Sequence, residues 1–245
     1  MVLDKSNVLI MVPALNEQES VGLVLSELMN HGYGVLLISD GSTDGTAEIG
    51  RTRGIPVLEL PINLGVGGAL RAGFKFACRN GYEAVVQVDA DGQHPENEIK
   101  NLIEEANRTG AHMVIGSRFI GDASSMKVSG MRRLAMMVLA RSASTAASHK
   151  VTDSTSGFRL IRQPLLEQFS SQFANNYLGD TYESVVSAGR AGYQIIEIPA
   201  GLRDRQHGES TATTGSAVRF TIKGLGVWIL GFHKKLAAAD SERRS

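Results

Sequence analysis

The stretch Ala84-Val85-Val86-Gln87-Val88-Asp89-Ala90-Asp91-Gly92-Gln93-His94 joins an apolar run of strand length to a polar turn that holds two carboxylates. A continuous apolar run of this kind is typical of a parallel strand buried on both faces of a sheet. Pro95 follows where a helix can begin, because the first helical residue needs no backbone N–H donor. The stretch therefore predicts a strand, a turn and a helix in succession.

The same succession occurs on both sides of this stretch. Apolar runs predict further strands at residues 8–12, 35–38, 57–60, 112–116, 158–161 and 194–198. Helices are expected at 16–31, from the 39–45 turn to 53, at 65–79, after Pro95, and at 129–149, 180–191 and 217–236. Such alternation indicates βαβ units, so we expect an α/β fold with a mostly parallel central sheet flanked by helices.

The division of the chain follows from the same pattern. We expect one domain over residues 1–210, an apolar or amphipathic helix within 211–236 and a disordered tail at 237–245. Loops are expected at 121–128 and 203–216. Asn16, with Glu19 three residues later, fits the cap of the first helix, and Thr43 or Asp44 fits the cap of the second.

Composition excludes several classes of protein. Of 245 residues, 42% are hydrophobic and 20% are charged, which is ordinary for a globular protein. The 25 basic and 25 acidic side chains cancel, so no overall field points to a nucleic acid. Cys78 is the single cysteine, and the N-terminal residues 1–5 lack the pattern of a signal peptide. With no apolar run long enough to span a membrane, a cytoplasmic protein is expected.

The charges are unevenly distributed along the chain. Between Glu83 and Glu105 there are seven acidic residues and one basic residue, whereas between Arg118 and Arg162 there are eight basic residues and two acidic ones. This order suits a cation site beside a phosphate site, and it equally suits two solvated faces of opposite charge.

Three polar segments are candidate sites. Asp89 and Asp91 can converge on one hard divalent cation, and Gln93 adds a neutral oxygen, as Mg²⁺ or Mn²⁺ prefers. Such a site would lie beyond the carboxyl ends of the strands, where open α/β sheets bind ligands. The 39–45 turn suits a base or ribose, or a helix cap. The glycine-rich 65–71 segment suits close helix packing, with Arg71 or backbone amides near a phosphate.

Six motifs in order resemble glycosyltransferase family 2, in the branch that contains dolichyl-phosphate mannose synthase and the polyprenyl-phosphate glycosyltransferases. The resemblance extends from about residue 7 to residue 210. The motifs are Val12-Pro13-Ala14-Leu15-Asn16-Glu17, Asp40-Gly41-Ser42-Thr43-Asp44-Gly45, Asn63-Leu64-Gly65-Val66-Gly67-Gly68-Ala69, Asp89-Ala90-Asp91-Gly92-Gln93-His94, Gly116-Ser117-Arg118-Phe119 and Thr155-Ser156-Gly157-Phe158-Arg159.

The resemblance implies an A-type (Rossmann-like) glycosyltransferase fold that uses a nucleotide-diphosphate sugar. It implies donor contacts from Pro13, Asn16, Glu17, Asp40, Gly67, Arg71, Asp89 and Ala90. Metal ligands for Mg²⁺ or Mn²⁺ would be Asp89, Asp91 and Gln93. Donor or acceptor phosphates would meet Arg118, Arg132, Arg133 and Arg159. The candidate catalytic carboxylates are Asp153, Asp180 and Glu183, although the last two also suit an exposed helix start.

The sequence departs from the family pattern at three places. Ser39 stands where the first acid of Asp-Asp-Gly-Ser is usual, and Ser154 replaces the proline that usually follows Asp153. The segment 177–183 is not in its commonest form. These departures leave the catalytic base and the acceptor class open.

The expected function is metal-dependent, inverting transfer of a sugar to a polyprenyl phosphate. The alternatives are a saccharide acceptor in cell-envelope glycan synthesis, a sugar nucleotidyltransferase, and a silent sugar-nucleotide binding module. Residues 217–236 combine apolar residues with three lysines, so that helix fits a membrane surface, and it fits equally well packing on the domain or on a second copy of the chain. A peripheral position on the cytoplasmic face of the membrane is therefore expected beside a cytoplasmic one.

Overall fold

A computed structural model describes residues 1–93, 95–120, 130–147, 150–173, 180–201 and 236–239. Of residues 96, 130–138 and 180 only the backbone is described. The strands are β1 (Val8–Ala14), β2 (Gly34–Asp40), β3 (Val57–Leu60), β4 (Ala84–Gln87), β5 (Met113–Ser117), β6 (Arg159–Arg162) and β7 (Ile195–Pro199). The helices are α1 (Val21–Asn30), α2 (Thr46–Thr52), α3 (Gly65–Arg79), α4 (Glu96–Thr109), α5 (Gly130–Ala147), α6 (Leu165–Gln172) and α7 (Asp180–Arg190).

The seven strands form one sheet in the order β3-β2-β1-β4-β6-β5-β7. Strands β1 to β4 run parallel to one another, and β5 runs parallel to β7. Only β6 among these strands is reversed, because it pairs antiparallel with both β4 and β5. The expectation of a mostly parallel α/β sheet is confirmed.

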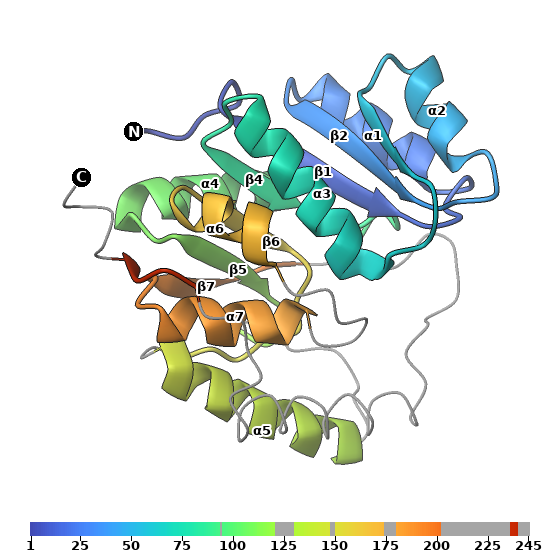
Figure 1. The fold of residues 1–245 in the computed structure, drawn as a ribbon. Coiled ribbons are helices and arrows are strands. Elements are labelled where there is room, and N and C mark those ends of the chain that lie inside the picture. The colour runs from blue at the N-terminus through green and yellow to red at the C-terminus, as the bar shows by residue number, and fades with distance from the viewer. Residues whose placement is uncertain (94, 121–129, 148–149, 174–179, 202–235, 240–245) are drawn as a thin grey trace.

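Helices cover both faces of the sheet (Figure 1). Helices α1 and α4 pack on one face and α3, α6 and α7 on the other, each against its own cluster of buried residues. Strand β1 supplies both clusters: Val8, Ile10 and Val12 face one, and Leu9 and Met11 face the other. Alternate residues of a strand point to opposite faces, so a strand buried on both sides has to be apolar throughout.

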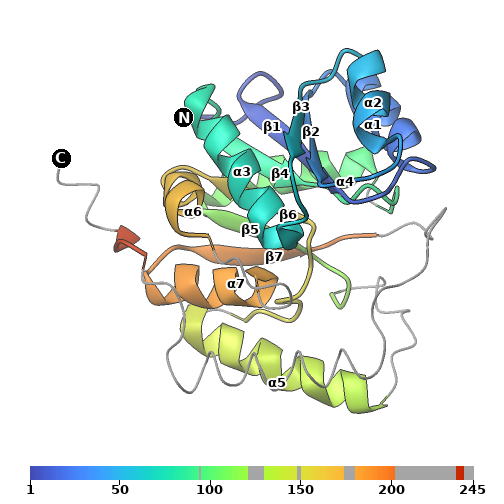
Figure 2. The same cartoon turned by 45° about the vertical axis from the view of Figure 1, so that its right-hand side comes forward.

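Helix α5 lies outside α7 and forms an outer layer in both views (Figure 1; Figure 2). The two helices approach closely at Gly189 of α7, where an added Cβ would lie 2.6 Å from the Cα of Ala147. Glycine is required there because the obstacle is backbone, which cannot move aside as a side chain can.

Most expected elements are confirmed, but one expected helix cap is wrong and one helix is not predicted by the sequence. Helix α1 begins at Val21, after Ser20, so Asn16 does not cap it. Asn16 instead has a left-handed φ of 56° and belongs to a loop. Helix α6 was not expected at all, because its eight residues are too few to show a clear helical period.

Several expectations concern residues that the structure does not describe. They are the loops at 121–128 and 203–216, the helix at 217–236 apart from Leu236, the domain limit at 210 and the end of the tail. Among the described helices, none is both long and apolar enough to cross a membrane.

The close crossing of α5 and α7 gives a test of the packing. We expect Gly189→Ala to lower the free energy of unfolding by about 1 to 3 kcal/mol, because the new methyl meets backbone. Gly73→Ala in α3 is the matched control, since its Cβ meets only the ends of the Met11 and Ile38 side chains, at 2.7 and 2.6 Å. Urea denaturation should show the larger loss for Gly189→Ala, and equal losses would contradict the assigned crossing.

Candidate active site

The candidate site lies at the edge of the sheet where the parallel strands end. The turns after β1, β2 and β4 meet at this edge because those strands run in the same direction. The end of β5 and the segment that leads into β6 also reach it, since β6 runs in the opposite direction to β5. We call residues 152–158 the pre-β6 loop.

The turns after β1 and β2 are joined by hydrogen bonds. Asn16 Oδ1 accepts from Thr43 N at 2.8 Å, and Glu17 N donates to Thr46 Oγ1 at 2.8 Å. Asp44 Oδ2 accepts from Gln18 N at 3.2 Å. Asn16 therefore supports the wall of the expected nucleotide pocket through its amide oxygen.

Asp44 also stabilises the start of α2. Its Oδ1 accepts from Thr46 N, the first backbone amide of the helix, at 3.0 Å. Of the two expected caps, Thr43 and Asp44, it is therefore Asp44 that bonds to the start of α2, although the residue at the N-cap position is Gly45. Burial acts to raise the pKa of Asp44, but hydrogen bonds from Thr46 and Gln18 hold that pKa below its ordinary value. The carboxylate is thus committed to the protein's own amides.

Asp40, expected to contact a base or ribose, lies at the end of β2 and is 4% exposed. Its Oδ1 accepts from Leu64 N at 2.8 Å and so fastens the segment before α3 to the sheet. Gly41 allows this approach: its φ is +70°, and a Cβ there would lie 2.5 Å from Asn63 N. Ser39, the family departure, is fully buried, and its Oγ has no hydrogen-bond partner within the described residues.

The Asp89-Ala90-Asp91 turn follows β4 after one further residue, Val88, close to where the sequence predicts it. Asp91 is 5% exposed and its Oδ1 accepts from Gln93 N at 3.1 Å. The carboxylate of Asp89 faces Gly157 of the pre-β6 loop, where an added Cβ would lie 3.3 Å from Oδ1. The glycine therefore leaves room beside the Asp89 carboxylate that any side chain would reduce.

This donor set fits a hard divalent cation. Nowhere in the described part of the chain do three His, Cys, Asp or Glu side chains gather as a metal-binding group. Mg²⁺ commonly takes only one or two protein carboxylates and completes its shell with waters and substrate phosphates. Asp89 and Asp91, with the side-chain amide of Gln93, are donors of the kind that such a site uses.

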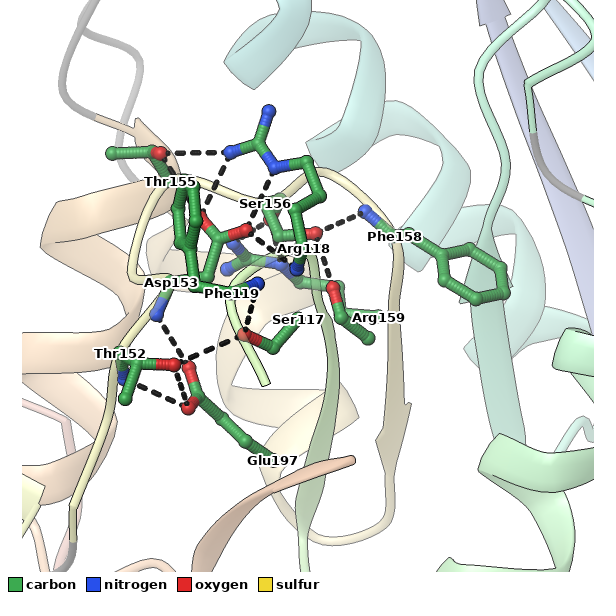
Figure 3. Close-up of polar contacts among 11 residues, drawn as sticks. Ser117, Arg118, Phe119, Thr152, Asp153, Thr155, Ser156, Phe158, Arg159 and Glu197 are labelled. Atoms are coloured by element: carbon green, nitrogen blue, oxygen red, sulfur yellow. Dashed lines mark hydrogen bonds and ion pairs between the residues drawn. The ribbon is translucent and has the colours of Figure 1, made fainter. Parts of the chain in front are cut away.

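Arg118 forms an ion pair with Asp153 (Figure 3), and the charge of Asp89 in this turn also acts on Arg118. Arg118 Nε donates to Asp153 Oδ2 at 2.7 Å and Nη2 donates to Oδ1 at 2.8 Å. The Asp153 side chain is fully buried, whereas that of Arg118 is 23% exposed. Burial alone would lower the pKa of Arg118, but Asp153, with a contribution from the charge of Asp89, raises that pKa above its ordinary value.

Glu197 of β7 completes the network, and sequence reasoning missed it. Its Oε1 accepts from Asp153 N at 2.7 Å, and its Oε2 accepts from Thr152 N at 2.7 Å and from Thr152 Oγ1 at 2.8 Å (Figure 3). Burial raises the pKa of Glu197, against the effect of these hydrogen bonds. One signal could have found it, since Glu197 is the single charge in the apolar run 195–198.

Arg159, expected to meet a phosphate, lies inside the protein. Its side chain is 1% exposed, and its guanidinium donates to the carbonyl oxygens of Ser156 and Thr181 and to Ser184 Oγ, the last at 2.8 Å. Arg159 therefore joins the pre-β6 loop to α7. Its expected contact with a phosphate stays a prediction.

The other expected site residues are placed as follows. Glu183 is 3% exposed on α7, so it is not part of an exposed helix start. Gly67 is buried in α3, and Arg71 on the same helix has a buried Nε without a hydrogen-bond partner among the described residues. Ala90 is buried and Pro13 half-buried. For Arg132, Arg133 and Asp180 only the backbone is described, in α5 and α7.

The sheet and its edge site define an A-type glycosyltransferase fold, and the comparisons give the family. The sequence model of glycosyl transferase family 2 matches residues 9–169, so the chain belongs to that family and is a glycosyltransferase. This confirms the resemblance that the six motifs indicate.

Three relatives show how far the similarity extends. An undecaprenyl-phosphate mannosyltransferase of Micrococcus luteus is 31% identical over 216 residues, which cover 85% of this chain and 88% of the relative. A polyprenol monophosphomannose synthase of Mycolicibacterium smegmatis is 27% identical, with 90% and 86% covered. A UDP-N-acetylglucosamine–dolichyl-phosphate N-acetylglucosaminyltransferase of Methanococcus voltae is 26% identical, with 78% and 83% covered.

A solved structure shares the fold. Glucosyl-3-phosphoglycerate synthase of Mycobacterium tuberculosis, in complex with Mn²⁺, UDP-glucose and phosphoglyceric acid, superposes with a TM-score of 0.68 at 20% identity. The similarity covers 91% of this chain and 79% of that one.

The buried ion pair gives a stability prediction. We expect Asp153→Asn to lower the free energy of unfolding by about 2 to 3 kcal/mol, because it leaves Arg118 without its buried counter-charge. The pair of Arg108 with Glu105 has the same two-bond geometry, 2.8 and 2.7 Å, on the surface. Glu105→Gln is therefore the matched control and should cost much less in urea denaturation, since exposed ion pairs are weak. Similar losses in both variants would contradict the assigned importance of the buried pair.

Proposed function

We propose that the enzyme transfers a sugar from a nucleotide-diphosphate donor to a polyprenyl phosphate, with a divalent metal and with inversion at the anomeric carbon. The observation that carries this proposal is the Asp89 carboxylate, which faces the pre-β6 loop and acts on the charge of Arg118 in the Arg118–Asp153 pair, with Asp91 two residues further along the same turn. Opposite charges so arranged suit a diphosphate held through a cation and a second phosphate held through an arginine.

The acceptor class is supported by the relatives. Their names give two different sugars, mannose and N-acetylglucosamine, but each of the three is named for a polyprenol or dolichol acceptor. The acceptor class is therefore what they share, and the sugar is what varies among them.

The donor would bind across the turns after β1, β2 and β4. Asp89, Asp91 and Gln93 would hold Mg²⁺ or Mn²⁺, which supplies positive charge to a departing nucleoside diphosphate. The wall formed by Pro13, Asn16 and Glu17 would contact the nucleotide, together with Asp40. Gly67 and Arg71 of α3 and Ala90 would line the same pocket.

The acceptor would meet Arg118 and, from α5, Arg132 and Arg133. A phosphate acceptor is already anionic, so it needs orientation more than it needs a base. Asp153 would orient Arg118 rather than act as a base, because both of its carboxylate oxygens accept hydrogen bonds from Arg118 and are poorly placed to take a proton. A hydroxyl acceptor would instead require a base such as Asp180 or Glu183.

The location of the enzyme follows from this acceptor. A polyprenyl phosphate resides in a membrane, so we infer that the enzyme works at the cytoplasmic face of one as a peripheral protein. Residues 217–236 are the proposed contact, since their sequence combines an apolar stretch with lysines that suit anionic headgroups.

A donor and acceptor panel tests the function. The full chain is incubated with Mg²⁺ or Mn²⁺, a set of nucleotide sugars, and either undecaprenyl phosphate in detergent or soluble saccharides. We expect release of nucleoside diphosphate that depends on the lipid phosphate, and a product of inverted anomeric configuration by ¹H NMR. Release dependent on a saccharide would assign the other acceptor class, and release of pyrophosphate would assign a nucleotidyltransferase; either result contradicts the proposal.

The metal site has its own test. We expect Asp91→Asn to retain the fold and to lower turnover by at least about 100-fold, because it removes a ligand charge where diphosphate charge must be balanced. Asp4→Asn is the control, since Asp4 is an exposed acid that precedes β1, at the opposite end of the strand from the site. Full activity of Asp91→Asn in excess EDTA would exclude the proposed metal role.

A further inference from the structure

We propose that Glu197 is a positioning residue for this reaction, although it lies on the edge strand β7 and is separated from the metal carboxylates by a loop. Its carboxylate would hold the pre-β6 loop so that Asp153 keeps Arg118 oriented toward the phosphates. The inference rests on the proposed function, because it assigns Glu197 to the orientation of the acceptor arginine.

The first step is the anchor. Glu197 is half-buried and accepts three hydrogen bonds, at 2.7, 2.7 and 2.8 Å, from the backbone of residues 152 and 153 and from the Thr152 hydroxyl. All three donors belong to two successive residues, so the carboxylate fixes the position and direction of the chain as it enters the pre-β6 loop. Ser117 Oγ, 3.0 Å from Thr152 Oγ1, joins the same point to the end of β5.

The second step passes from the loop to the arginine. Asp153 N is bonded to Glu197, and the Asp153 side chain makes the two-bond pair with Arg118. Thr155 Oγ1 adds a bond from Arg118 Nη2 at 3.1 Å. The other terminal nitrogen of Arg118, Nη1, points away from Asp153 (Figure 3) and has no hydrogen bond to the described part of the protein. That nitrogen is the one offered to a ligand.

The third step connects the same loop to the metal carboxylates. Gly157, four residues after Asp153, faces the carboxylate of Asp89, and the charge of Asp89 contributes to the raised pKa of Arg118. A displacement of the loop would therefore change two distances together: Arg118 relative to the acceptor, and Gly157 relative to Asp89.

The chemistry at this position requires a carboxylate. Both oxygens of Glu197 face N–H donors, Asp153 N on one side and Thr152 N on the other. A glutamine of the same size would place an NH₂ group against one of these N–H groups, and one of the backbone bonds would be lost. Glu197→Gln is consequently a small change in volume that weakens the anchor by at least one backbone bond.

The test is a double-mutant cycle with the full chain. We expect Glu197→Gln to lower kcat/KM for the lipid phosphate by about 10- to 100-fold, with a smaller change in the KM of the donor. In an Arg118→Lys background the same substitution should lower kcat/KM by less than about 3-fold, because the arginine through which it acts is already absent. Glu59→Gln on the other edge strand, β3, is the matched control and should leave activity unchanged.

A second measurement is independent of turnover. The Nε–H signal of Arg118 in the ¹⁵N-arginine spectrum, assigned by its loss in Arg118→Lys, should exchange with solvent at least about 10-fold faster in Glu197→Gln. If Glu197→Gln does not fold, Thr152→Val removes one bond to the same carboxylate and should give a smaller effect in the same direction.

The outcomes separate this inference from the proposed function. The positioning role would be overturned if Glu197→Gln lowered kcat/KM by the same factor with and without Arg118→Lys. It would also be overturned if the solvent exchange of the Arg118 Nε–H were unchanged in Glu197→Gln, even if lipid transfer is confirmed. Absence of transfer in the unmodified protein would overturn the proposed function, and the Arg118 signal would then still decide whether Glu197 holds the arginine.

Discussion

The reversed direction of β6 is the constraint on which the arrangement of the site depends. In a wholly parallel sheet the segment entering a strand lies at the opposite edge from the segments that leave its neighbours. Because β6 lies antiparallel between β4 and β5, the loop that enters it reaches the edge where those two strands end. Asp153 and Gly157 thereby come beside Arg118 and Asp89, which are distant in sequence.

This arrangement places charged side chains in the interior of the protein, where hydrogen bonds and an ion pair stabilise them. Asp153, Arg159 and Glu183 are each at most 3% exposed. An isolated buried charge is strongly unfavourable, so each of these groups needs partners within the protein. Asp153 has Arg118, and Arg159 has the carbonyl oxygens of the loop and of α7. The buried polar residues at this end of the sheet therefore depend on one another for the hydrogen bonds that water would otherwise provide.

The sequence predicts the sheet well because each buried strand carries an uninterrupted apolar run, a signal that needs no knowledge of neighbours. The proposed metal turn is equally local in the sequence, since the three residues proposed as ligands lie within five positions. The failures are of another kind. Asparagine is a common helix-capping residue, but Asn16 accepts a hydrogen bond from Thr43, which lies 27 residues further along the chain. A local sequence pattern cannot reveal such a distant partner. Glu197 acquires its partners only when β7 pairs with β5.

The bonds between the turns after β1 and β2 also bear on how a nucleotide would bind. Backbone groups of Glu17 and Gln18 are held by Thr46 and Asp44, so the protein's own hydrogen bonds fix the shape of this wall. A preformed wall loses little conformational entropy when it is occupied, and affinity then depends mainly on the contacts made. Under the proposed binding mode, substitutions in this wall would alter selectivity among nucleotides with little disturbance of the fold. The part of the proposed site around Arg118 and Asp153 would then remain constant while donor preference diverged.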